Sequence, residues 1–266
     1  MKAGAAATVL DFSAVTEQPG QGATHLQLSM LETRYGWAAQ HASGKDVLEV
    51  ACGAGLGLGW MAERARRVEA GDIDLENCSL AQETYRGQSK VRVQYMDALD
   101  LPFEAGSFDV VLLFEALYYL PDVPRFLAEA RRVLRPTGML LISTVNCEWG
   151  GFHPSPYHVK YWTAAELFEA AEDAGFEARV FAGFAETGTA WSLLRTRLKT
   201  AASRSGLIPR TMRGKAALKR IFYGRLERIP PRLDAATATL EPMIPVDRSA
   251  DLTRYRNLYF EGRRTA

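Results

Sequence analysis

The stretch that decides the fold is KDVLEVACGAGLGLGWM, which runs from Lys45 to Met61. A run of β-branched residues and leucine ends in an acid, glycines crowd the turn, and a helical pattern follows. A strand that leads through a glycine-rich turn into a helix presents backbone N–H groups and the positive end of the helix dipole to a ligand. The stretch therefore predicts a cradle for a cofactor.

The glycine spacing argues against a dinucleotide as that cofactor. A dinucleotide fingerprint needs G-x-G-x-x-G or G-x-G-x-x-A in the turn itself. Counting from Gly53 or Gly55 places a leucine or a tryptophan where the third small residue belongs, and the formal match that begins at Gly57 starts inside the helix. A carboxylate at Glu49 would repel phosphate and suits a ligand that carries an ammonium group.

The segment EVACGAGLG resembles the first motif of class I S-adenosylmethionine-dependent methyltransferases, usually an acid, two residues and then Gly-x-Gly. Ala51 stands where many members carry glycine. A later segment, RRVLRPTG, is similar to the R-V-L-x-P-G-G segment of the family, with Thr137 in place of the first glycine. The resemblance covers roughly residues 46 to 180.

The resemblance implies S-adenosylmethionine as the cofactor. It places Ala51, Gly53 and Gly55 beside the cofactor, with Glu49 positioning its amino-acid end. It also implies that helices before the core lie over the cofactor, and helical spacing from 23 to 41 predicts one or two helices there. Arg34 or Tyr35 could bind the methionine carboxylate; alternatively, Arg34 is a solvated charge and Tyr35 a packing residue.

The composition indicates one folded α/β domain with additions. With 266 residues, of which 47% are hydrophobic, the chain can bury a substantial core. A formal net charge of +1 does not favour any class of binding partner. Three widely separated cysteines indicate neither a zinc site nor a disulfide framework, which fits a reducing cytoplasm. The sequence shows no signal peptide and no stretch of 18 apolar residues, so we expect a soluble protein.

Strand-like and helix-like runs alternate along the chain after the glycine turn. Strands are expected at 68–73, 91–96, 108–114, 139–145, 175–181 and 254–262, with helices at 76–86, 123–134 and 163–174. This alternation predicts an α/β fold. It is a Rossmann-like, seven-stranded, mostly parallel sheet with helices on both faces, an antiparallel last strand and a helical insertion before that strand.

We expect three parts in the chain. Residues 1–44 form an N-terminal arm and the helices that cover the cofactor. Residues 45–187 and 251–266 form the methyltransferase core, and 188–250 form a basic helical insertion. In open sheets of this kind, ligands bind beyond the carboxyl ends of the strands.

Two acids follow neighbouring strands at that edge. Asp74, with Leu75 beside it, lies roughly twenty residues beyond the glycine turn, where an acid takes ribose hydroxyls; the alternative is a helix N-cap. We expect Asp72 to be structural. Asp97 and Ala98 resemble the adenine site of the family, and the alternative there is an Asx turn.

Candidate catalytic residues follow the later strands. Phe114 and Glu115 end a strand beside the expected methyl group, as a wall of the cofactor site and as an acid that faces the substrate; Phe114 could instead be core. The loop at 145–162 carries His153 and His158, either of which could act as a general base, although structural histidines are commoner. Glu115 or a tyrosine is the alternative base. No metal site is expected.

The insertion is one-sidedly basic. From Thr189 to Arg232 a single acid, Glu227, stands among many arginines and lysines, and apolar residues repeat at helical spacing. Such helices could cover the site for an anionic acceptor, touch an anionic membrane surface or bind nucleic acid; alternatively, the insertion is a lid with solvated charges. We expect it to shape the acceptor pocket.

These patterns predict an enzyme that transfers a methyl group from S-adenosylmethionine to an oxygen, or a nitrogen, of a small-molecule acceptor. One alternative is a cofactor-binding regulatory module without turnover. Another is a nucleic-acid methyltransferase that uses the basic insertion, which the sequence disfavours because the Phe-Glu-Ala-Leu-Tyr-Tyr segment lacks the Asp/Asn-Pro-Pro-aromatic pattern of nucleobase amine methylation. The sequence does not determine the oligomeric state.

Overall fold

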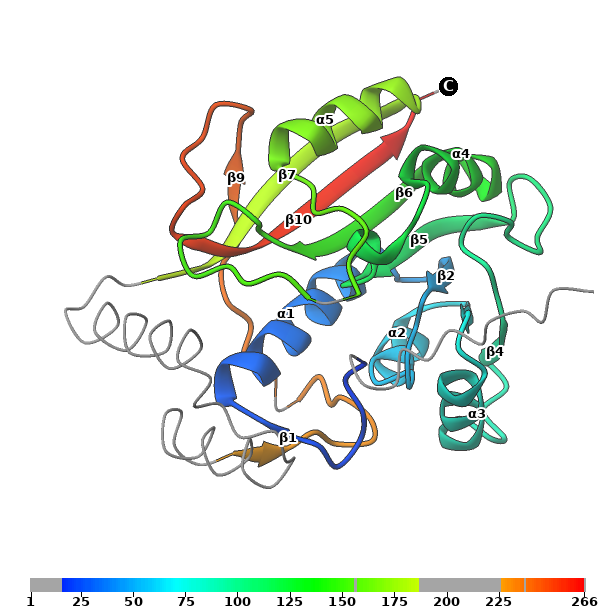
Figure 1. Cartoon of the computed structure of the whole chain (residues 1–266). Helices are drawn as coiled ribbons and strands as arrows, with labels where there is room; N and C mark the ends of the chain where they lie inside the picture. The colour runs from blue at the N-terminus through cyan, green and yellow to red at the C-terminus, as the bar shows by residue number, and fades with distance from the viewer. Residues whose placement is uncertain (1–15, 156, 187–225, 237, 266) are drawn as a thin grey trace, which may run out of the picture.

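The computed structural model describes residues 16–155, 157–186, 226–236 and 238–265, arranged around one large sheet (Figure 1). The sheet has eight strands in the order β4-β3-β2-β5-β6-β10-β7-β9. Their bounds are β2 Asp46–Val50, β3 Arg67–Asp72, β4 Val91–Tyr95, β5 Phe108–Phe114, β6 Leu134–Val145, β7 Phe176–Ala185, β9 Ile244–Val246 and β10 Tyr255–Arg264. Pairings from β4 to β6 are parallel, and β10 runs antiparallel to both β6 and β7.

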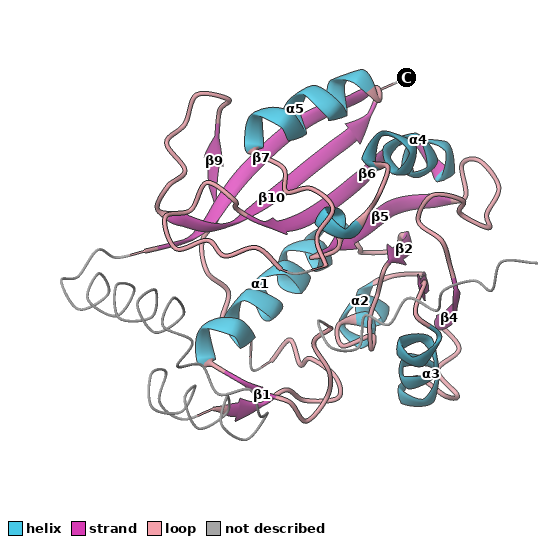
Figure 2. Ribbon diagram, in the orientation of Figure 1, coloured by secondary structure: helices cyan, strands magenta, loops and turns pink. Residues whose placement is uncertain are grey.

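Helices cover both faces of the sheet (Figure 2). They are α1 His25–His41, α2 Leu58–Arg64, α3 Leu75–Thr84, α4 Val123–Val133 and α5 Ala164–Asp173, with a 3-10 turn, η1, at Leu117–Tyr119. Alternate side chains of β5 enter two different cores: Val110 and Leu112 pack with residues of α1 and α2, whereas Val111 and Leu113 pack with residues of α4 and α5. A strand buried on both faces is continuously apolar, as β5 is from Val110 to Phe114.

The predicted fold class is confirmed, with one strand more than expected. All seven predicted strands form, and β10 inserts antiparallel as predicted. The eighth, β9, comes from the segment assigned to the helical insertion and pairs with β7 at the sheet edge.

The rest of the predicted insertion lies partly outside the described residues, which begin again at 226. Where the chain is described, it is extended: β8 (Glu227–Arg228) pairs with β1 (Gly22–Ala23). Leu233 is buried against the α1 and α2 side of the core and donates its N–H to the carbonyl of Leu56. The predicted basic helices between 189 and 225 lie outside the described residues.

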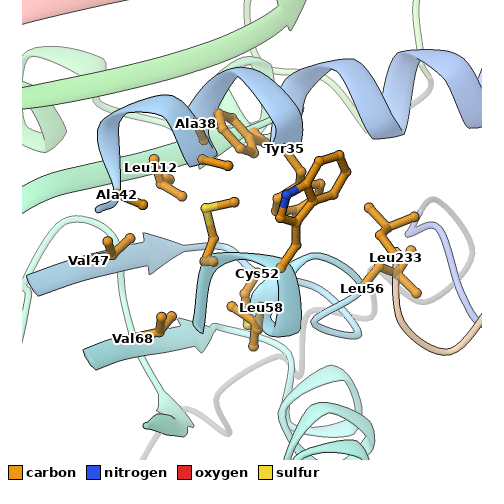
Figure 3. Packing of buried hydrophobic residues seen from close by; sticks show 14 of the residues in the cluster. Tyr35, Ala38, Ala42, Val47, Cys52, Leu56, Leu58, Val68, Leu112 and Leu233 are labelled. Carbon is orange, nitrogen blue, oxygen red and sulfur yellow. The ribbon is translucent and has the colours of Figure 1, made fainter. Parts of the chain in front are cut away.

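Helix α1 packs closely on the first turn of α2 (Figure 3). A capping box formed by Thr24 and Gln27 starts α1, and the Tyr35 ring then lies on Gly57. A β-carbon added at Gly57 would fall 2.1 Å from that ring, far inside van der Waals contact. The absence of a side chain at Gly57 therefore allows α1 to reach the end of β2.

We expect Gly57→Ala to destabilise the fold by about 1–3 kcal/mol, the usual cost of overpacking, because the new methyl group collides with Tyr35. Gly59→Ala, two residues along the same helix, is the matched control: its β-carbon would meet Tyr85 at an ordinary 3.4 Å. There we expect a gain of about 0.5–1 kcal/mol from helix propensity. Urea unfolding measures both variants, and equal stabilities would contradict this packing.

Candidate active site

A cavity of about 690 Å³ lies where β2 and β5 end. This is the point where the strand order reverses, the usual ligand site of open α/β sheets. The wall is built from α1, the turns after β2, β3, β4 and β5, and the start of β10. It includes Thr16, Glu17, Met30, Arg34, Tyr35, Glu49, Ala51, Gly53, Asp72, Ile73, Asp97, Ala98, Phe114, Glu115, Tyr118, Trp149 and Asn257.

The glycine turn adopts left-handed backbone angles at three alternate residues. Ala51 has φ +55°, Gly53 +54° and Gly55 +75°. Ala51 and Gly53 line the cavity, and the alanine holds a conformation that costs a residue with a β-carbon about 1–2 kcal/mol. Gly55 is not among the lining residues; a β-carbon there would lie 3.0 Å from both Leu58 and Ala81. Gly55 thus serves the packing of the turn.

Glu49 lies in the floor of the cavity and is 1% exposed. Its Oε1 accepts a hydrogen bond of 2.5 Å from the Tyr35 hydroxyl. Its Oε2 is buried and makes no hydrogen bond to any described residue. Burial raises the pKa of the Glu49 carboxyl to about 7, although Tyr35 and Arg34 oppose the rise. A cationic group in the cavity would satisfy the free oxygen and favour the ionised form.

Arg34 lies beside Tyr35 on α1 and also lines the cavity. Its guanidinium pairs with the Glu17 carboxylate, while its Nε is buried without a hydrogen bond from the described chain. Burial opposes its charge, yet Glu17 and the neighbouring acids raise the pKa of Arg34 overall. Arg34 is therefore a buried cation on the cavity wall that already binds a carboxylate.

The structure revises the ribose assignment. The Asp74 carboxylate is the N-cap of α3, accepting from the backbone N–H groups of Glu76 and Asn77, and Asp74 does not line the cavity. Leu75 is 61% exposed. Asp72 and Ile73 line the cavity instead.

Asp72 is tied to the glycine turn. Its carboxylate accepts the N–H of Gly53 at 2.8 Å and that of Asp74 at 2.9 Å, and burial raises its pKa. Asp72, which we expected to be structural, thus lines the cavity, whereas Asp74 has the N-cap role that was its alternative.

Asp97 and Ala98 lie where the sequence placed them, on the wall after β4. Asp97 Oδ1 accepts the N–H of Leu99 at 2.8 Å, which is the Asx turn of the alternative reading. The turn and a ligand contact are compatible, because a carboxylate has a second oxygen. Asp97 therefore stays a candidate for the adenine.

Phe114 and Glu115 close the other half of the cavity. Phe114 is 6% exposed and meets the Tyr35 ring edge-on, with centroids 5.4 Å apart. Glu115 is held at φ +52°, a rare angle for a side chain of this kind. Its Oε1 accepts from Ser143 Oγ and Asn257 Nδ2, both at 3.2 Å. Burial raises the pKa of Glu115.

Neither predicted histidine reaches the cavity. His153 and His158 are exposed and are not among the lining residues. The His158 ring stacks on Tyr161, with centroids 4.8 Å apart, and its Nδ1 meets the carbonyl of Ser155. His158 thus packs within the loop after β6, and Glu115, with the tyrosines Tyr118 and Tyr119, remains on the cavity wall as a candidate base. Across the described residues, no three His, Cys, Asp or Glu side chains are grouped as metal ligands.

Sequence reasoning missed several residues of the wall, among them Glu17, Trp149 and Asn257. Glu17 precedes the first periodic segment, and Asn257 comes from the last strand, so neither stands near a motif. Trp149 stands in the loop after β6, outside any recognised motif. Its indole Nε1 is buried without a partner among the described residues, as is Asn257 Oδ1. Buried polar atoms without a hydrogen-bond partner can be recognised only from the three-dimensional structure.

Comparison with known proteins identifies the family. Residues 48–142, from β2 into β6, match the family model described as a methyltransferase domain. Over these residues the chain is a methyltransferase domain, and its curated relatives there are S-adenosylmethionine-dependent methyltransferases. The matched segment contains the glycine turn, Asp72, Asp97 and Glu115, so the family region supplies most of the cavity wall.

Two curated relatives show the range of the match. A probable S-adenosylmethionine-dependent methyltransferase from Mycolicibacterium smegmatis is 36% identical over 163 residues, 60% of this chain and 62% of that protein. Phthiotriol/phenolphthiotriol dimycocerosates methyltransferase 1 from Mycobacterium ulcerans is 45% identical over 108 residues, 39% of each chain. The chain thus spans less than two thirds of these relatives.

A solved structure extends the fold match to nearly the whole chain. The [4+2]-cyclase SpnF superposes with a TM-score of 0.61 at 18% identity, covering 94% of this chain and 89% of that one. Its printed name denotes a reaction other than methyl transfer. The likeness therefore shows the fold, and the chemistry must be argued from the residues of the site.

The residues present fit S-adenosylmethionine. The free Oε2 of Glu49 suits the ammonium group, and Arg34 suits the carboxylate of the methionine part. Asp72 and Asp97 follow at the ends of β3 and β4, as ribose and adenine acceptors. Strands β2, β3 and β4 are neighbours in the sheet, so Glu49, Asp72 and Asp97 follow one another in the same order as the amino-acid part, the ribose and the adenine of the ligand.

We expect the affinity for S-adenosylhomocysteine to fall as the pH is lowered from 7 to 5.5, because Glu49, with a pKa of about 7, becomes neutral. The amino group of the ligand stays protonated over that range, so the loss approaches tenfold per pH unit. Glu49→Gln should bind weakly with no such slope. Glu63→Gln, an exposed acid on α2, should keep it. Calorimetry measures all three, and an equal slope in Glu49→Gln would refute this role.

Proposed function

We propose that this protein transfers a methyl group from S-adenosylmethionine to a hydroxyl oxygen of a small, largely apolar molecule. The observation that carries the proposal is that one continuous cavity holds both the acidic end, with Glu49 and Asp72, and a second end at Glu115. The second end is lined mainly by apolar and aromatic residues, with Arg256 and Asn257 beside them. Its wall includes Leu26, Met30, Phe114, Tyr118, Tyr119, Leu120, Val145 and Trp149.

The acidic end aligns the cofactor. S-adenosylmethionine supplies an activated methyl group when bound. Arg34 and Glu49 hold its amino-acid part, Asp72 holds the ribose and Asp97 the adenine. Phe114, which separates the two ends, excludes water from the path between them. Because the methyl group is already activated, alignment and exclusion of water are the main tasks of the protein.

Glu115 performs the proton transfer. As the acceptor oxygen bonds to the methyl carbon, the bond from that carbon to sulfur breaks, and the hydroxyl proton passes to the Glu115 carboxylate. Burial raises the pKa of Glu115, which makes it a better base than an exposed carboxylate. Hydrogen bonds from Ser143 and Asn257 keep it ionised and fix its direction.

The acceptor class has independent support. The Mycobacterium ulcerans relative is named for methyl transfer to phthiotriol and phenolphthiotriol dimycocerosates, a name that matches the apolar wall. No described helix has the length and apolar character needed to cross a bilayer.

The direct test offers the protein labelled S-adenosylmethionine with organic extracts and with aqueous extracts that contain nucleic acid. We expect S-adenosylhomocysteine to form with the organic extract, together with a product heavier by one methyl group. Turnover with nucleic acid alone would contradict the proposed acceptor. Cofactor binding without turnover on either extract would favour a regulatory module.

We expect Glu115→Gln to lower kcat by about 10²- to 10⁴-fold, the usual contribution of a general base, while the affinity for S-adenosylhomocysteine changes little. Glu104→Gln, an exposed acid in the loop before β5, is the matched control and should leave kcat unchanged. Single-turnover assays measure both variants. A Glu115→Gln enzyme with wild-type kcat would assign the proton to another acceptor.

A further inference from the structure

Asn257 projects from β10 into the acceptor end of the cavity. The strand places it opposite Val145 of β6 and Gly183 of β7, and the side chain is 7% exposed. Its Nδ2 donates to Glu115 Oε1 at 3.2 Å. Its Oδ1 is buried and accepts no hydrogen bond from the described residues. A buried amide oxygen without a donor is rare in folded proteins.

The orientation of this amide is fixed by its neighbour. If the amide were turned over, its oxygen would face the Glu115 carboxylate, and two acceptors would meet. Glu115 Oε1 already draws Ser143 Oγ and Asn257 Nδ2 toward it. Asn257 Oδ1 is therefore left beside the base as an acceptor that no described residue satisfies, on a side chain that lines the cavity.

A second buried polar atom without a described hydrogen-bond partner belongs to another residue of the cavity wall. Trp149 lines the cavity, and its indole Nε1, a donor, is buried with no partner among the described residues. A hydroxyl group can donate one hydrogen bond and accept another. The acceptor end thus offers a base, an oxygen that needs a donor and an N–H that needs an acceptor, in apolar surroundings.

We propose that the acceptor carries a pair of neighbouring hydroxyl groups on an apolar body, and that Asn257 selects it. One hydroxyl reaches Glu115 and is methylated. The other donates to Asn257 Oδ1 and remains free in the product. Because Asn257 is hydrogen-bonded to the base, the two hydroxyls lie on adjacent or next-adjacent carbons. This inference rests on the proposed function and narrows its substrate class to diols. Asn257 is a positioning residue, since it takes no proton.

The test compares the binding of octane-1,2-diol, octan-1-ol and 2-methoxyoctan-1-ol, the last of which lacks only the second donor. Each is titrated into the protein saturated with S-adenosylhomocysteine and followed by ligand-observed NMR. We expect the diol to bind about tenfold tighter than either mono-alcohol, the usual effect of one hydrogen bond to a buried acceptor.

Two variants test whether Asn257 is the residue that causes the preference for the diol. Asn257→Leu should lose the diol preference, whereas Ser143→Ala, which removes the other donor to Glu115 Oε1, should keep it. Equal affinities in the wild-type protein, no binding of any alcohol, or a preference that survives Asn257→Leu would each overturn the inference. The wild-type comparison decides it even if Asn257→Leu fails to fold.

The proposed methyl transfer and the proposed diol preference can be disproved separately. S-adenosylhomocysteine production without a diol preference would leave methyl transfer in place and remove the role of Asn257. A diol preference without turnover on any extract would leave the binding site in place and remove the proposed reaction.

Discussion

The hydrogen bond from Tyr35 to Glu49 is the contact on which the cavity depends. It joins α1, which precedes the sheet, to the end of β2, and it forms because Gly57 lets the tyrosine ring lie on the first turn of α2. With one carboxylate oxygen held by tyrosine, the other is left buried and unsatisfied in the floor of the cavity. Desolvation of that oxygen raises the pKa of Glu49 toward neutrality. A cationic group bound beside it would stabilise the ionised carboxylate.

The other residues of the cavity wall are arranged around this buried carboxylate. Acids at the ends of β3 and β4 continue the polar end, whereas Phe114 and the aromatic residues after β5 and β6 make the opposite end apolar. Glu115 lies at this second end, at a strained backbone angle that its hydrogen bonds stabilise. A related fold bears the name of a cyclase, so the placement of Glu115, rather than the fold, carries the argument for methyl transfer.

Periodicity and the glycine turn were enough to predict the seven principal strands, because continuous apolar runs and helix caps are local signals, and the family resemblance implied the antiparallel last strand. Spacing could not choose between Asp72 and Asp74. Both stand near the end of β3, and the choice depended on which carboxylate capped α3. The histidines failed as candidates because a loop's direction is set by packing such as that of His158 on Tyr161. Asn257, distant in sequence from every motif, could be placed only by the antiparallel insertion of β10.

The most direct measurement of the central claim is a calorimetric titration of the purified protein with S-adenosylmethionine, repeated with NADH, at pH 7.5. The acid-lined cavity predicts saturable binding of one sulfonium nucleoside per chain and no detectable heat from the dinucleotide, whose phosphates meet carboxylates instead of a glycine cradle. Failure to bind S-adenosylmethionine at millimolar concentration, or preferential binding of NADH, would contradict the account.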